Sequence, residues 1–234
     1  MEDIIYKHRL ILTTLVEILP AIVGLLLYKY YKDTQVKYFI WFLTYLTICD
    51  FISNYYLLIK NDGILSFLKN TVISGTWWWV TLFWDIGAIL FFSFYYQKVL
   101  NTSIFKSIIK YSSIVFLVFS VGYIFMNWEA FFIMFFPIIS ILGAIIIFMC
   151  SIFYFIEILL SDKILTFYKS INFYISFTIF IWWLITTPIL FFEIYGSNND
   201  LEFRATRNML YLMANIFMYL TFTFALLWCK PQND

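Results

Sequence analysis

The sequence predicts an all-α polytopic membrane protein, a bundle of about seven transmembrane helices with its N-terminus outside and its C-terminus in the cytoplasm. Three observations predict this class: 63% of the 234 residues are hydrophobic, only 12% are charged, and long apolar segments recur along the chain. Soluble domains contain about 25% charged residues, so this chain has too few polar side chains to cover a water-facing surface. We therefore expect most of its surface to face lipid.

Seven apolar segments are predicted to be the spans, because a helix needs about 20 apolar residues to cross the hydrocarbon core. They lie near residues 10–28, 38–59, 77–97, 108–126, 130–160, 171–192 and 209–228. The uncharged runs within them contain no Lys, Arg or His, and the fourth run, which begins at Tyr111, reaches span length only by including Ile108 and Ile109 beyond Lys110. The fifth holds Pro137 and Gly143, which predict a tilted or kinked helix, or an opening stretch at the interface before the span.

Local signals support the other spans. The first follows Glu2 and Asp3 and has no small-residue cleavage motif after it, so we expect it to be retained rather than removed as a signal peptide. The third begins with Trp77–Trp79, a triplet typical of the aromatic belt at a membrane interface. The sixth contains Pro188, which membrane helices tolerate as a kink or hinge. The second and seventh are uninterrupted apolar runs that meet the length requirement directly.

The distribution of basic residues predicts the orientation. With the N-terminus outside, more of the Lys and Arg residues, among them Lys29, Lys106 and Lys169, fall in cytoplasmic connections than in external ones. This is the bias that sets the topology of membrane proteins. The connections are short and contain no Gly/Ser/Pro-rich linker, so residues 1–234 are predicted to form a single integral membrane domain. The expected location is a bacterial cytoplasmic (inner) membrane.

Acidic residues inside the spans are the main functional signal. A charged side chain at the bilayer centre costs at least about 2 to 3 kcal/mol unless it is protonated, paired or hydrated. Glu17, Asp50 and Asp85 lie on three consecutive spans, each about 10–13 Å from the outer end at a rise of ~1.5 Å per residue. Glu157, the fourth acid, lies about one turn from a cytoplasmic helix end, where a structural role is favoured.

Polar side chains at a similar depth predict a cavity that opens outward. The predicted ligand- or ion-binding residues are Glu17, Asp50, Asn54, Asp85, Thr187 and Asn215. Since no basic side chain lies in the spans at the depth of the three acids, the acids must be protonated, share protons, or face a cation or a cationic ligand. The alternative is that each acid is neutral and hydrogen-bonded to a neighbouring helix, and merely holds the bundle together.

Several other functions lack the residues that they need. A formal net charge of +1 without a basic cluster argues against nucleic acid as a partner. One histidine is too few for the zinc-dependent membrane hydrolases, and the last span has no lysine for a retinal Schiff base. The three cysteines, at positions 49, 150 and 229, form no CxxC pair. The chain is therefore predicted to be no enzyme, and to have no metal site and no cofactor.

The first two spans also carry a family resemblance. The run Glu17-Ile-Leu-Pro20 on the first, Asp50 on the second and the short seven-span chain resemble uncharacterised membrane proteins common in Bacteroidota-type bacteria. The likeness extends over the whole chain, and such seven-helix regions also look like the sensor portions of some bacterial receptors. The resemblance implies sensing. No kinase or other output domain is expected after Trp228, so a partner would have to carry the output.

Two functions are consistent with these residues. One is a non-enzymatic membrane sensor or ligand-binding protein that takes a proton, a cation or a cationic small molecule and acts on a membrane protein partner or a second copy of itself. The other is a small proton- or cation-coupled transporter or channel that uses the same acids as a relay. In both, the lipid bilayer is the first partner.

Overall fold

The computed structural model describes residues 2–60, 65–69, 71–195 and 201–229, and every regular element in these ranges is a helix. In chain order they are α1 (Glu2–Leu26), α2 (Tyr28–Tyr31), α3 (Val36–Ser53), α4 (Tyr55–Lys60), η1 (Ser66–Leu68), η2 (Val72–Ser74), α5 (Trp77–Trp79), η3 (Val80–Ile86), α6 (Gly87–Val99), α7 (Ser103–Met126), α8 (Trp128–Ile133), α9 (Pro137–Leu159), η4 (Asp162–Leu165), η5 (Phe167–Lys169), α10 (Ile171–Tyr195) and α11 (Leu201–Trp228). The element η3 is a π-helical stretch, and the other four η elements are 3₁₀ turns.

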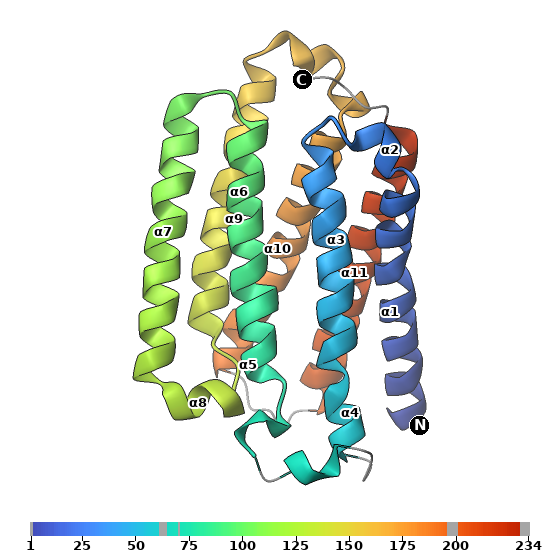
Figure 1. Ribbon diagram of the computed structural model, residues 1–234, viewed down its shortest axis with the longest axis vertical. Helices are drawn as coiled ribbons and strands as arrows, with labels where there is room; N and C mark the ends of the chain where they lie inside the picture. Colours follow the sequence, from blue (N-terminus) through green and yellow to red (C-terminus); the bar gives the residue numbers. More distant parts are fainter. Residues whose placement is uncertain (1, 61–64, 70, 196–200, 230–234) are drawn as a thin grey trace.

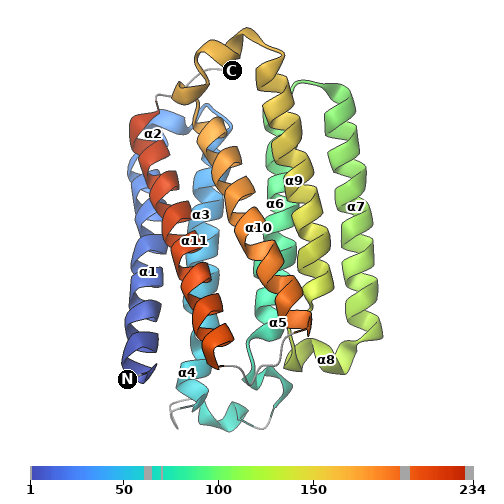
Figure 2. The ribbon, with the colours of Figure 1, turned by 180° about the vertical axis from the view of Figure 1, so that it is seen from behind.

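The long helices form an up-and-down bundle in which six of them make a ring and one lies outside it. α1 packs against α3 and α11, α11 against α10, and α10 against α9. The continuous unit of η3 and α6 closes the ring between α9 and α3, while α7 packs on the outer side of α6 and α9 (Figures 1 and 2). α1 begins at the end of the bundle where α8 lies, and α11 ends at the opposite end (Figure 1).

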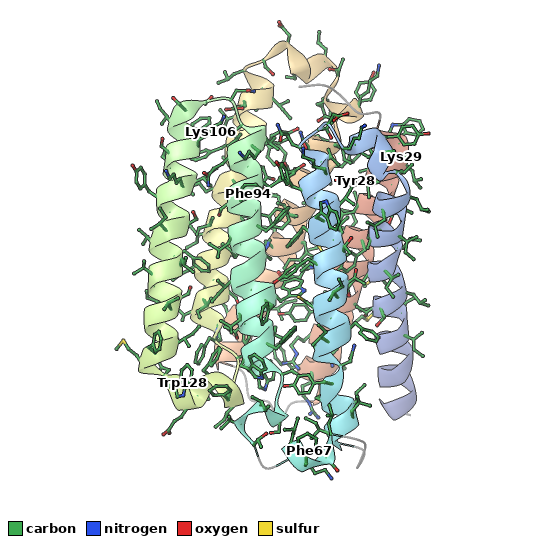
Figure 3. The ribbon with its side chains drawn as sticks, viewed as in Figure 1. Tyr28, Lys29, Phe67, Phe94, Lys106 and Trp128 are labelled. Atoms are coloured by element: carbon green, nitrogen blue, oxygen red, sulfur yellow. The ribbon has the colours of Figure 1, made fainter. Side chains whose placement is uncertain are left out.

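The bundle has the composition and surface of an integral membrane protein. Within the part of the chain that the structure describes, six helices are long and apolar enough to cross a membrane, and a shorter apolar helix, Ile11–Leu26, accompanies them. Large apolar side chains such as Phe51, Val115 and Met126 are more than two-thirds exposed on these helices, as lipid-facing side chains are. Figure 3 places Lys29 and Lys106 at the end of the bundle where α11 ends. These findings confirm the predicted helical membrane class.

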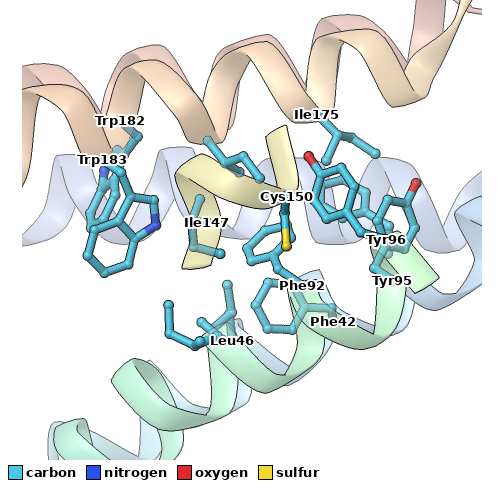
Figure 4. Packing of buried hydrophobic residues seen from close by; sticks show 14 of the residues in the cluster. Phe42, Leu46, Phe92, Tyr95, Tyr96, Ile147, Cys150, Ile175, Trp182 and Trp183 are labelled. Carbon is cyan, nitrogen blue, oxygen red and sulfur yellow. The ribbon is translucent and has the colours of Figure 1, made fainter. Parts of the chain in front are cut away.

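An apolar layer fills the centre of the ring. Gly143 of α9 allows α9 to approach α6 closely, because a Cβ atom at this position would lie 2.7 Å from Cγ1 of Ile89. Ile147 and Cys150, one and two turns further along α9, are fully buried. In Figure 4 they lie between two aromatic pairs, Trp182 with Trp183 on one side and Tyr95 with Tyr96 on the other. The layer therefore separates the polar groups at one end of the bundle from those at the other.

The predicted fifth span, residues 130–160, is not one kinked helix. It consists of the short helix α8, a break at residues 134–136, and α9, which begins at Pro137. Proline is favoured at the first position of a helix, where its missing N–H group costs no hydrogen bond. Of the two expectations for this segment, the structure agrees with a separate opening stretch before the span.

Other boundaries also differ from the prediction. α7 begins at Ser103, so the fourth span has full length and includes Lys106 in its first turn. α11 extends back to Leu201, whereas the predicted span began at residue 209. The predicted second span is interrupted at Asn54, between α3 and α4. Pro188 lies inside α10 and does not end it.

Candidate ligand-binding cavity

A cavity of about 280 Å³ lies inside the ring, in the half of the bundle nearest α8. All six ring helices contribute to its wall, and α7 does not. The lining residues are Thr13, Glu17, Asp50, Val80, Trp84, Asp85, Phe135, Ser140, Trp182, Trp183, Thr186, Leu190, Tyr211, Asn215 and Tyr219. No Lys, Arg or His is among these described residues. The structure thus brings the three acids Glu17, Asp50 and Asp85, together with Asn215, to one cavity.

Glu17 of α1 and Asp50 of α3 form a carboxyl–carboxyl pair, because the two helices pack side by side at this level. The two carboxyl groups lie within hydrogen-bonding reach of each other, and Glu17 also interacts with the hydroxyl of Tyr219 on α11. A carboxylate has no hydrogen to donate, so a hydrogen bond between the two requires the pair to hold at least one proton. Glu17 is only 3% exposed, and its Oε1 atom has no hydrogen-bond partner among the described residues.

Asp85 lies on η3, apart from this pair. It is 7% exposed and interacts with Ser140 of α9, yet neither Asp85 Oδ2 nor Ser140 Oγ completes a hydrogen bond of good geometry within the described residues. The described residues contain no group of three or more potential metal-binding side chains. The cavity therefore has two acidic poles, the Glu17–Asp50 pair and Asp85, which do not converge on one point.

The π-helical turn at Val80–Ile86 is held by a neighbouring helix. The N–H group of Gly87 bonds to the carbonyl of Leu82, five residues earlier. The next carbonyl along the chain is that of Phe83. The hydroxyl of Tyr45 on α3 donates to this oxygen at 2.8 Å. A Cβ atom on residue 87 would lie 2.9 Å from the Tyr45 hydroxyl, so glycine permits this approach. Such turns occur often at functional sites, and this one carries Asp85.

Aromatic rings form much of the remaining wall. The rings of Trp84 and Trp182 lie with centroids 5.4 Å apart, and those of Trp182 and Trp183 with centroids 5.2 Å apart. The indole N–H of Trp182 donates to Oδ1 of Asn215 on α11 at 2.8 Å. The two tryptophans of α10 belong both to the core and to the cavity wall.

Two of the predicted site residues do not line the cavity. The side-chain amide of Asn54 donates to the backbone carbonyl of Asp50 at 2.9 Å. It thus supplies a hydrogen bond to a carbonyl group near the C-terminal end of α3, and not to the carboxyl group of Asp50. The hydroxyl of Thr187 donates to the carbonyl of Trp183 at 2.6 Å, one turn back on α10. Thr186 is the α10 threonine that reaches the cavity. Adjacent helix residues point about 100° apart, and of the two threonines it is Thr186 whose direction brings it to the cavity wall.

Several residues that line the cavity were not predicted from the sequence. Tyr211 and Tyr219 stand one turn before and one turn after Asn215, and this spacing of four was a readable signal for one face of α11. Trp84 and Ser140 had no comparable signal, because their inward direction depends on the π-helical turn and on where α9 begins.

Glu157 belongs to a different region at the opposite end of the bundle. Its carboxylate accepts the backbone N–H groups of Asn101 and Thr102, with the shortest contact at 2.6 Å. It thereby caps the start of α7, where a negative charge is favourable. A second cavity of about 370 Å³ lies beside it, lined by residues that include Tyr154, Ser170 and Asn172.

Comparisons with known proteins do not add an assignment. No protein-family model, curated protein or solved structure matches this chain. The functional argument therefore rests on the geometry of the cavity.

Proposed function

We propose that this chain is a non-enzymatic seven-helix membrane sensor or ligand-binding protein whose acidic cavity takes a proton, a cation or a cationic small molecule. The observation that carries the proposal is the pair of buried carboxyl oxygens, Glu17 Oε1 and Asp85 Oδ2, that line one cavity without a partner or a basic neighbour among the described residues. A buried polar atom without a partner costs about 1–3 kcal/mol, and more if it is charged. A cation between the two poles would recover that energy.

The orientation proposed is N-terminus outside and C-terminus inside. α1 is counted as a span in addition to the other six, which makes seven. An odd number of passes agrees with the placement of the start of α1 and the end of α11 at opposite ends of the bundle (Figure 1). Lys29 and Lys106 lie at the end that would be cytoplasmic (Figure 3). The cavity would then open outward. Labelling of intact cells with an impermeant maleimide should modify Glu129→Cys and spare Lys106→Cys, and the reverse pattern would overturn this topology.

Ligand binding has a structural route to the rest of the molecule. Since all six ring helices contribute to the cavity wall, a bound cation stabilises one arrangement of those helices over others. The change in helix arrangement would be passed to a membrane protein partner or to a second copy of the chain. The function proposed is thus a population shift rather than a chemical reaction.

Thermal unfolding of the purified protein in nanodiscs tests the binding proposal. A ligand at 100 times its Kd stabilises a folded protein by about 2.7 kcal/mol, so cations or a change of pH should shift the Tm. Asp85→Asn and Glu17→Gln should each weaken that response, because the amide keeps the shape and removes the charge. Glu129→Gln, an exposed change on α8, is the matched control and should respond as the unmodified protein does. Equal responses in all of these proteins would contradict the proposal.

A second candidate function, a small proton- or cation-coupled transporter or channel, is favoured by one observation. The second cavity lies at the other end of the bundle, and buried hydroxyls of Ser93, Ser151 and Thr178, without partners among the described residues, lie between the ends. Together they could make a polar path that the central apolar layer interrupts. Cation- or proton-driven flux in proteoliposomes, abolished by Asp85→Asn, would favour transport. Ligand-dependent stabilisation without flux would favour the sensor.

A further inference from the structure

The unsatisfied groups of the cavity need donors. Glu17 Oε1 and Asp85 Oδ2 are acceptors whenever their carboxyl groups are ionised. Two other polar lining groups are already engaged, since Asn215 Oδ1 accepts the Trp182 N–H and the Thr186 hydroxyl donates to the Trp182 carbonyl at 2.9 Å. A complementary ligand therefore brings positive charge together with N–H groups.

The wall distinguishes an organic cation from a metal ion. Trp84, Trp182 and Trp183 offer aromatic surface beside the acidic poles, and such surface attracts cations that give up their hydration easily. Small metal cations instead require several oxygen ligands around one point. The described part of the chain contains no group of three or more side chains that could hold a metal ion. The combination of aromatic surface with two unpartnered carboxyl oxygens suits an ammonium group attached to carbon.

The volume limits the size of the ligand. Pockets for drug-sized molecules measure about 300–1,000 Å³, and this cavity of about 280 Å³ lies just below that range. At about 30 Å³ for each water molecule, its volume corresponds to roughly nine waters. A short-chain amine fits this space, whereas a peptide or a nucleotide does not.

We infer that the cavity binds a small primary ammonium ion, with its N–H groups directed to Glu17 Oε1 and Asp85 Oδ2 and its carbon chain against the rings of Trp84 and Trp182. This inference rests on the proposed function and specifies the ligand class for the same site. The Glu17–Asp50 pair keeps its shared proton and contributes at most one negative charge, while Asp85 contributes the other. Both poles thus attract the same cation from different sides of the cavity.

Calorimetric titration of the protein in nanodiscs with methylammonium and butylammonium tests the inference, with sodium and tetramethylammonium at equal concentration for comparison. Both primary ammonium ions should bind at least about tenfold more tightly than sodium, because only they use the aromatic wall. They should also bind more tightly than tetramethylammonium, which has no N–H group to donate. This comparison uses the unmodified protein and does not depend on the folding of any variant.

Substitutions then locate the site. Asp85→Asn and Trp84→Leu should each weaken methylammonium binding about tenfold, while Trp128→Leu, an exposed tryptophan of α8, should leave it unchanged. If sodium binds as tightly as methylammonium, or if Asp85→Asn leaves methylammonium binding unchanged, the ammonium inference is wrong. The proposed function would survive the first of these results, provided that the sodium or pH response still requires Asp85. If neither the cations nor a change of pH alters binding or the Tm, both the ammonium inference and the proposed function are wrong.

Discussion

The close contact between α9 and α6 leads to a quantitative prediction for Gly143→Ala. The added Cβ atom would lie 2.7 Å from Cγ1 and 2.8 Å from Cδ1 of Ile89, whereas carbon atoms pack at about 3.5–4.0 Å. Ile89 is 1% exposed, so its side chain has little space into which it can move. Overpacking of this kind costs about 1–3 kcal/mol, and the better helix propensity of alanine returns at most about 1 kcal/mol. We expect a net loss of roughly 1–2 kcal/mol.

Reversible unfolding in mixed micelles, followed by far-ultraviolet circular dichroism, measures this loss. Gly122→Ala on α7 is the matched control, because a Cβ atom there meets nothing within 4 Å. This control should be neutral or slightly stabilising. The two glycines are otherwise comparable, since both lie within long apolar helices.

A double-mutant cycle isolates the contact. Ile89→Ala alone should destabilise the protein by about 2–5 kcal/mol through the space that it leaves. On that background Gly143→Ala should no longer be destabilising, which corresponds to a coupling energy of about 1–3 kcal/mol between the two sites. If the two substitutions are additive, or if Gly143→Ala behaves as Gly122→Ala does, the close approach of α9 and α6 is refuted.

Three further predictions concern hydrogen bonds. Tyr45→Phe should destabilise the bundle by about 1–3 kcal/mol, because it removes the hydroxyl that donates to the Phe83 carbonyl of the π-helical turn; an unchanged unfolding midpoint would contradict this role. Glu157→Gln should cost about 1–2 kcal/mol by removing charge-assisted bonds at the start of α7, and Glu157→Ala should cost more in the same assay. Burial, reinforced by Cys229 nearby, raises the pKa of Tyr31 to about 12, so its stabilising contribution is present below the unfolded pKa of about 10 and is lost as the pH rises through about 12. Tyr31→Phe should remove this component of alkaline unfolding, which a pH titration of the unfolding midpoint would detect.

The sequence alone determined the class of the protein and the depth of its polar groups. Apolar length predicts membrane spans because a fixed hydrocarbon thickness requires a fixed number of helical residues. A constant rise per residue likewise places Glu17, Asp50 and Asp85 near one level, and the structure brings them to one cavity. The binding role of these residues stays a prediction.

The direction in which side chains point was decided by the tertiary structure. In a soluble helix the apolar face marks the interior, but in a membrane helix lipid and protein interior are both apolar, so the sequence pattern carries little information about rotation. For this reason Thr187 and Asn54 were predicted as binding residues although they do not line the cavity, whereas Ser140 and Trp84 line it and were not predicted.

Local backbone geometry was also set by contacts between distant segments. The π-helical turn that carries Asp85 depends on the hydroxyl of Tyr45, 38 residues before Phe83 in the chain. The carboxyl pair of Glu17 and Asp50 depends on the packing of α1 against α3. The sequence fixes how far along the membrane normal each residue lies, because helical rise is a property of the backbone. Which residues meet depends on helix packing, because only packing sets the rotation and the neighbours of each helix.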